Sequence, residues 1–115
     1  MEELNSPKSY MYYWHFSNDT KERLINKLTL ALPALRGAVG ASQDEIANII
    51  GLSRQTYNSI ELRKRRMTWG TYMALILFFD YNPLSHNTIR QIEVFPYQLD
   101  ECWLSGKVEQ LAGGK

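Results

Sequence analysis

The stretch SQDEIANIIGLSRQTYNSIE, residues 42–61, contains two helix starts separated by a glycine. Ser42 and Glu45 have the spacing of a capping box, in which each of the two side chains bonds a backbone N–H at the start of a helix. Gly51 then supplies the permissive backbone that ends a helix, and Ser53 can cap a second one. The sequence therefore predicts two short helices joined by a tight turn.

Apolar residues in this stretch occupy the positions where the two helices would face each other. They are Ile46, Ala47 and Ile50 in the first helix, and Tyr57 and Ile60 in the second. The outward face of the second helix carries only side chains that can donate hydrogen bonds, Arg54, Gln55, Asn58 and Ser59. Two helices joined by a tight turn, the second polar on its outer face, is how a helix-turn-helix places side chains in the DNA major groove.

The segment from about Leu28 to Asn82 resembles the helix-turn-helix of the XRE family, the bacterial and phage regulators that include the lambda-type repressors and Cro. The resemblance rests on Leu35-Arg36, Val39-Gly40, Ser42-Gln43, Ala47, Gly51-Leu52-Ser53, Ile60-Glu61, the basic run that follows, and Thr68-Trp69. Two positions depart from the family. Arg63 and Met67 stand where it usually has glycine and proline.

Contacts to bases are predicted on the second helix of the motif. Arg54 and Gln55 lie on its leading turn, which is the part that reaches base edges in helix-turn-helix proteins. Arginine suits guanine and glutamine suits adenine, each through two hydrogen bonds. Asn58 and Ser59 lie one turn further on, where a side chain can contact a base or a phosphate.

Contacts to phosphate are predicted on both sides of these residues. Gln43 occupies a helix start where the family commonly holds a DNA phosphate, and Lys64 and Arg65 occupy its usual basic positions. The full predicted set is Gln43, Ser53, Arg63, Lys64, Arg65 and Arg66. By contrast, the resemblance implies that Arg36 and Glu61 form a structural ion pair between the preceding helix and the end of the second helix.

The charge distribution favours the same surface. Residues 51–66 carry five basic side chains against Glu61, a charge of +4, whereas the net charge of +1 leaves −3 for the remainder. A charge run alone is more often a solvated face. Its position directly after the polar helix favours a surface that meets phosphate.

The chain as a whole is predicted to be all-α, because no alternation typical of a β-strand is sustained. We expect a compact five-helix, lambda-repressor-like domain over residues 18–96, an N-terminal arm over 1–17 and a C-terminal tail over 97–115. The first helix begins at Asn18 or Asp19, where Asp19 and Glu22 repeat the capping-box spacing, and it kinks or breaks near Pro33. Its apolar stripe is Leu24, Leu28, Leu32, Leu35 and Val39.

The later helices are predicted from their caps and apolar spacing. A fourth helix begins at Thr68 and ends at Asn82-Pro83, with Tyr72, Leu75, Ile76 and Phe79 inward. A fifth runs over Asn87–Val94, with Ile89 and Ile92 inward. The tail from Tyr97 is expected to keep Leu99, Trp103 and Leu104 close together and then to fray.

The arm contains five aromatic residues, Tyr10, Tyr12, Tyr13, Trp14 and Phe16. That apolar surface is too large to leave in water, so we expect it to pack on the domain or on a second copy. Together with the Trp103 region of the tail, it is the expected surface of a homodimer.

Other functions find little support in the composition. The candidate metal ligands are far apart in the sequence and lack the spacing of a metal site; they are His15, His86 and Cys102. No nucleophile elbow or phosphate-binding glycine loop appears in the sequence. We therefore expect no enzyme activity, metal or cofactor. A single cysteine, no signal-peptide core and no apolar run of membrane-spanning length indicate a cytoplasmic protein without a membrane partner.

These observations predict a sequence-specific, DNA-binding transcriptional regulator with double-stranded DNA as its partner. One such module reads few base pairs, so we expect a repressor that binds a palindromic operator as a homodimer. The alternative is an antitoxin-type protein, which binds a partner toxin through its arm or tail and autoregulates through the same DNA-binding domain.

Overall fold

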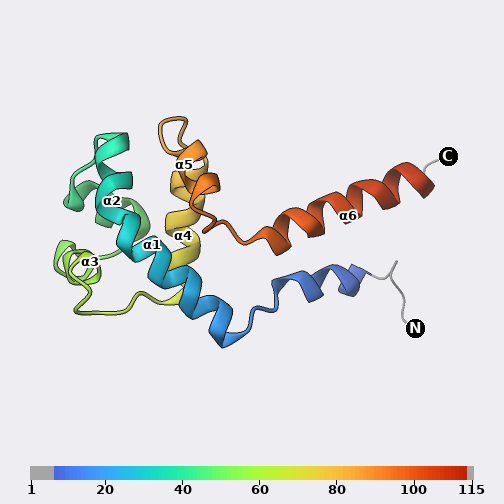
Figure 1. Cartoon of the computed structure of the whole chain (residues 1–115), viewed down its shortest axis with the longest axis horizontal. Coiled ribbons are helices and arrows are strands. Elements are labelled where there is room, and N and C mark those ends of the chain that lie inside the picture. The colour runs from blue at the N-terminus through green and yellow to red at the C-terminus, as the bar shows by residue number, and fades with distance from the viewer. Residues whose placement is uncertain (1–6, 114–115) are drawn as a thin grey trace. The chain divides into compact units, whose positions relative to one another are not determined.

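The computed structural model describes residues 7–113, and no strand occurs in that range (Figure 1). The prediction of an all-α protein is confirmed. The elements are the 3-10 helix η1 (Pro7–Trp14) and the α-helices α1 (Asn18–Val39), α2 (Gln43–Ile50), α3 (Arg54–Glu61), α4 (Trp69–Asp80), α5 (His86–Gln91) and α6 (Tyr97–Gly113). The chain forms two compact units. One comprises residues 19–95, and the other combines the chain up to residue 18 with the chain from residue 96.

The caps predicted for α2, α3 and α4 are formed as expected. The Ser42 hydroxyl accepts a hydrogen bond from the Glu45 backbone N–H at 3.1 Å, and the Ser42 N–H donates to the Glu45 carboxylate at 2.8 Å. Gly51 ends α2 with φ of 84°, a left-handed conformation that suits a residue without a Cβ. Ser53 and Thr68 cap α3 and α4 through their hydroxyls, which accept hydrogen bonds from the backbone N–H groups of Thr56 and Thr71. The boundaries of these three helices follow from side-chain chemistry that the sequence displays.

A kink or a break is predicted near Pro33, and the break is wrong, because α1 continues to Val39. Pro33 is exposed, so its ring and the carbonyl that loses its donor lie on the outer side of the helix. Leu32 and Leu35 on either side are fully buried, and their packing holds both halves of the helix in the core. The helix starts at Asn18 as predicted, and the carboxylate of Glu22, predicted to take part in a capping box with Asp19, pairs with Arg66.

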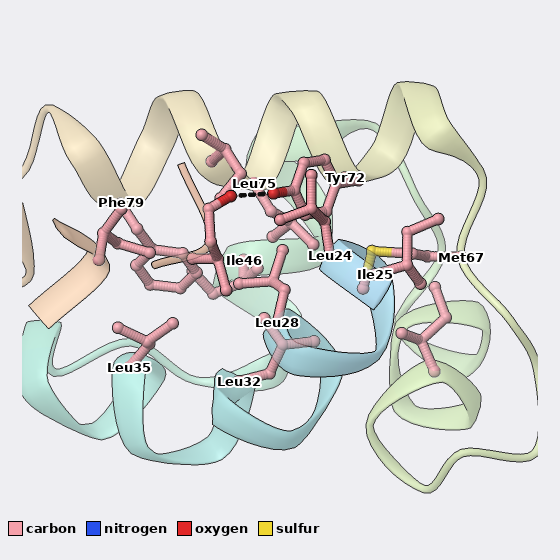
Figure 2. Packing of buried hydrophobic residues seen from close by; sticks show 14 of the residues in the cluster. Leu24, Ile25, Leu28, Leu32, Leu35, Ile46, Met67, Tyr72, Leu75 and Phe79 are labelled. Carbon is pink, nitrogen blue, oxygen red and sulfur yellow. Dashed lines mark hydrogen bonds between the residues drawn. The ribbon is translucent and has the colours of Figure 1, made fainter. Parts of the chain in front are cut away.

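The core of residues 19–95 forms between α1 and α4 and is closed by α2, α3 and α5 (Figure 2). All four inward residues predicted for α4 are buried, and α1 contributes Leu24, Ile25, Leu28, Leu32 and Leu35. The Tyr72 hydroxyl donates to the Val94 carbonyl, the dashed line in Figure 2, so the one polar atom of that buried ring is satisfied. Burial raises the pKa of Tyr72. This core places α2 and α3 on a rigid support.

The fifth helix is shorter than the predicted Asn87–Val94. It ends at Gln91, and Glu93 then takes a left-handed φ of 60°. An ion pair fixes the helix to the end of α4: Arg90 donates to both carboxylate oxygens of the buried Asp80, at 2.8 and 3.0 Å. His86 also contacts Asp80, with 3.0 Å between its Nδ1 and a carboxylate oxygen. Hydrogen bonds from Arg90 lower the pKa of Asp80 despite its burial.

The second unit consists of η1 and α6, which lie side by side (Figure 1). The Gln98 amide donates to the Tyr13 carbonyl at 3.0 Å, and the Tyr10 ring lies against Gly106. Fraying is expected only over the last five residues, 111–115, and α6 continues to Gly113. η1 supplies a packing surface that the sequence of the tail does not reveal. Residues 1–6 of the arm and Gly114–Lys115 of the tail lie outside the described residues.

Candidate nucleic-acid interface

The turn between α2 and α3 fixes the orientation of the second helix. The N–H of Leu52 donates to the Ala47 carbonyl at 2.8 Å, which closes the turn around Gly51. On the inner face of α3, Tyr57 and Ile60 are buried. The opposite face of α3 is therefore turned away from the core.

That outer face presents the four residues predicted to contact bases. Arg54 and Gln55 are exposed on the first turn of α3, and Asn58 and Ser59 are half-buried one turn later. Ser53 precedes them as the cap, where its hydroxyl accepts from the Thr56 N–H and donates to the Thr56 hydroxyl. Ser53 is predicted to contact a phosphate, but in the structure its hydroxyl caps the start of α3.

Four hydrogen bonds converge on the carboxylate of Glu61 at the end of α3. Arg36 of α1 donates from Nε at 2.8 Å and from Nη2 at 3.2 Å, so the ion pair implied by the sequence is formed. The Tyr57 hydroxyl donates at 2.6 Å, and the Gln43 amide donates at 3.0 Å. These bonds join α1, α2 and α3 at one carboxylate. They fix the helix that presents Arg54.

The cluster also sets the charge of its members. Burial alone would raise the pKa of Glu61, but the hydrogen bonds from Arg36, Tyr57 and Gln43 together lower it. The bond to Glu61 raises the pKa of Arg36, and burial raises that of Tyr57. Glu61 is therefore an anion that donors from three elements satisfy, which is the condition for holding a charge in a buried site.

The loop after α3 turns sharply at Arg63. This residue has φ of 61°, so an arginine adopts the left-handed conformation that usually selects glycine. The N–H groups of Lys64 and Arg65 both donate to the Ser59 carbonyl, at 2.9 and 3.2 Å. The turn thereby keeps the basic run next to the last turn of α3.

The four basic residues of this loop are all exposed, but they are not equivalent. Arg66 is paired with Glu22 of α1, with 3.1 Å between Nε and a carboxylate oxygen. Arg63, Lys64 and Arg65 line a hollow of about 310 Å³, together with Arg66 and the α1 residues Asn26, Thr29 and Leu30. The four basic members of the predicted phosphate-binding set therefore line one hollow beside α1, whereas Gln43 and Ser53 do not line it, and Arg66 is already paired with Glu22.

A second hollow connects the starts of α2 and α3. It has a volume of about 530 Å³ and is lined by Arg36, Ser42, Gln43, Asp44 and Arg54. This hollow therefore brings together Gln43, which is predicted to contact a phosphate, and Arg54, which is predicted to contact a base. The amide of Gln43 has an internal partner in Glu61, which the sequence did not indicate.

Two residues that support this surface differ from their predicted roles. The sequence places Tyr57 in the core, and its hydroxyl also donates to Glu61; the spacing of four residues between them is the signal that could indicate this bond. The sequence places Glu22 in a helix cap, and its carboxylate pairs with Arg66 at the end of the basic loop. No local sequence pattern indicates the pair between Arg66 and Glu22, because the two residues lie 44 positions apart.

Other kinds of site are not evident in the part of the chain that the structure describes. Within it, no three His, Cys, Asp or Glu side chains are grouped as metal ligands. None of the helices described there has both the length and the apolar character to cross a membrane. No family model, curated protein or solved structure matches the chain.

Proposed function

We propose that this protein is a sequence-specific DNA-binding regulator of transcription, of the XRE helix-turn-helix type, that acts as a repressor in the cytoplasm. The observation that carries the proposal is the outer face of α3. Arg54 and Gln55 project from a capped first turn, while the buried face of the same helix and the Glu61 cluster hold it in place. Side chains that read bases need this combination of exposure and fixed orientation.

The basic loop supplies the second part of the interface. Arg63, Lys64 and Arg65 follow α3 directly and are exposed. Contacts to phosphate position a protein on the duplex and give most of its non-specific affinity, whereas base contacts select the sequence. We assign the loop to the first role and the leading turn of α3 to the second.

The proposed operator is palindromic. One helix in one major groove reads few base pairs, so two copies related by a two-fold axis would read two half-sites whose centres lie about 34 Å apart. A homodimer is therefore part of the proposal. By occupying such a site, the protein would exclude other proteins from the same DNA.

The test is a selection of bound sequences from random double-stranded DNA with the purified full-length chain. The proposal predicts an enriched motif with two inverted half-sites. In a parallel selection, Gln55→Ala should lose the preference at one or two positions of each half-site. The matched control is Gln91→Ala, an exposed glutamine of α5, which should enrich the same motif as the native protein. Enrichment of no motif would contradict the proposal.

A further inference from the structure

The hollow between α1 and the loop after α3 has the lining of an anion site. Its volume is about 310 Å³, at the small end of the range for ligand pockets. The four basic residues of the loop, 63–66, line one side of it, and none of the described residues that line it is acidic. Four cations against the single carboxylate of Glu22, which pairs with Arg66, leave an excess of three positive charges.

The loop that carries these charges is held in shape at both ends. At its start, Arg63 has φ of 61°, and the N–H groups of the next two residues both donate to the Ser59 carbonyl. At its end, Met67 is buried in the core. A non-glycine residue in the left-handed region is strained, and such strain is characteristic of sites that clamp a ligand. Cations fixed in this way lose less freedom when an anion binds.

The α1 side of the hollow adds a neutral donor. Asn26 is exposed there, and its amide can donate to a phosphoryl oxygen. Thr29 beside it is already engaged, because its hydroxyl donates to the Ile25 carbonyl at 2.7 Å. Guanidinium groups suit phosphoryl oxygens because they donate two hydrogen bonds in a fixed geometry. The hollow thus offers donors from two elements to one phosphorylated group.

The excess charge indicates which phosphorylated group fits. A phosphodiester of the DNA backbone carries a single negative charge and would offset one of the three positive charges. Two linked phosphoryl groups place several negative charges in one compact group. We propose that the hollow binds the diphosphate group of a small molecule, which competes with DNA phosphate for the basic loop and releases the operator. The release rests on the proposed function, whereas the binding of the diphosphate does not.

The first experiment titrates the full-length chain with inorganic pyrophosphate in a calorimeter, without DNA or magnesium and at constant ionic strength. One site is expected, with an affinity at least about tenfold higher than that for inorganic phosphate. Arg63→Gly removes one cation and the backbone strain together, and it should weaken binding about tenfold without harming the fold. The control, Lys107→Ala, removes an exposed cation of α6 and should change the affinity less than about twofold. Absence of binding, or equal losses for both variants, would overturn the proposal.

A second variant tests the geometry of the hollow without changing its charge. Asn26→Leu keeps the approximate shape of the side chain and removes the amide donor. It should weaken pyrophosphate binding about fivefold or more, because a hydrogen bond to a charged group is lost. Thermal denaturation of the variant establishes that it is folded. An unchanged affinity in the folded variant would show that the anion binds outside the hollow and would overturn the proposal.

Competition with DNA tests the regulatory step. At constant ionic strength, pyrophosphate should release the selected operator from the native chain, whereas sodium sulfate should release much less. For Asn26→Leu, the pyrophosphate concentration that releases half of the operator should rise by the factor measured in the calorimeter. Pyrophosphate that occupies its site while the operator stays bound would overturn the regulatory step.

The two proposals can fail separately. A chain that binds pyrophosphate as described but selects no DNA sequence would contradict the proposed function alone. A chain that selects an operator but does not bind pyrophosphate would contradict the diphosphate site alone.

Discussion

Arg36 of α1 donates two hydrogen bonds to Glu61, the last residue of α3, at 2.8 and 3.2 Å. The side chain of Glu61 is only 6% exposed in this pair. The structure contains a second pair of the same chemistry, Arg66 with Glu22, in which both side chains are at least half exposed. The two pairs allow the effect of burial to be measured within one protein.

The buried pair should contribute far more to stability than the exposed one. Arg36→Ala leaves a buried carboxylate without its cation, which costs about 3–5 kcal/mol of unfolding free energy. Arg66→Ala should cost at most about 1 kcal/mol, because solvent screens the exposed pair. Urea denaturation of both variants against the native chain measures the difference. Similar losses for the two would contradict the role assigned to the Glu61 cluster.

The same cluster predicts a loss of stability in acid. The folded pKa of Glu61 lies below its unfolded value, which is about 4.3. The stabilisation is therefore complete above the unfolded pKa and disappears as the pH falls through the folded pKa. The difference in unfolding free energy between the native chain and Glu61→Gln should shrink as the pH is lowered from about 7 to about 3. Denaturation midpoints over that range provide the measurement, and a difference independent of pH would exclude this linkage.

Arg63 is expected to be a position where glycine stabilises the fold. A left-handed conformation costs a residue with a Cβ about 1–2 kcal/mol. Glycine avoids this cost, but its unfolded chain has a larger conformational entropy, which offsets part of the gain in unfolding free energy. Arg63→Gly should therefore raise the unfolding free energy by about 0.5–1 kcal/mol. Lys64→Gly, at the next position, where φ is not positive, should lower it. Thermal denaturation of the two variants tests the prediction, and destabilisation by Arg63→Gly would contradict it.

The basic loop should control the dependence of DNA binding on salt. Lys64→Ala and Arg65→Ala should each weaken binding to all sequences and reduce the salt slope by about one unit. Arg66→Ala should change the slope less, because Glu22 already neutralises that guanidinium. Affinities measured from low to moderate salt give the slopes. An unchanged slope for Lys64→Ala and Arg65→Ala would remove the loop from the interface.

The helix boundaries of the motif could be predicted because their signals are local. Ser42 with Glu45, Gly51 and Ser53 act on backbone groups within a few residues, and each takes the predicted role. The break at Pro33 was wrong because that signal is also local, whereas the burial of Leu32 and Leu35 outweighs it. Tertiary packing decided the outcome there.

The parts that could not be predicted depend on distant partners. α6 has one face against η1 and a second apolar stripe elsewhere, so its apolar residues do not form the single stripe that identifies an amphipathic helix. The bond from Gln43 to Glu61 and the pair between Arg66 and Glu22 join residues far apart in sequence. The positions of the base-reading candidates follow from the pattern, but the positions of the residues that hold them do not.

The proposed function depends on base reading by the leading turn of α3. The decisive measurement compares the affinities of the native chain, Arg54→Ala and Gln55→Ala for the selected operator and for unrelated DNA. Each variant should lose about 1–3 kcal/mol of binding free energy on the operator and little on unrelated DNA, with unfolding free energies unchanged. Equal losses on both DNAs, or no loss on the operator, would contradict it.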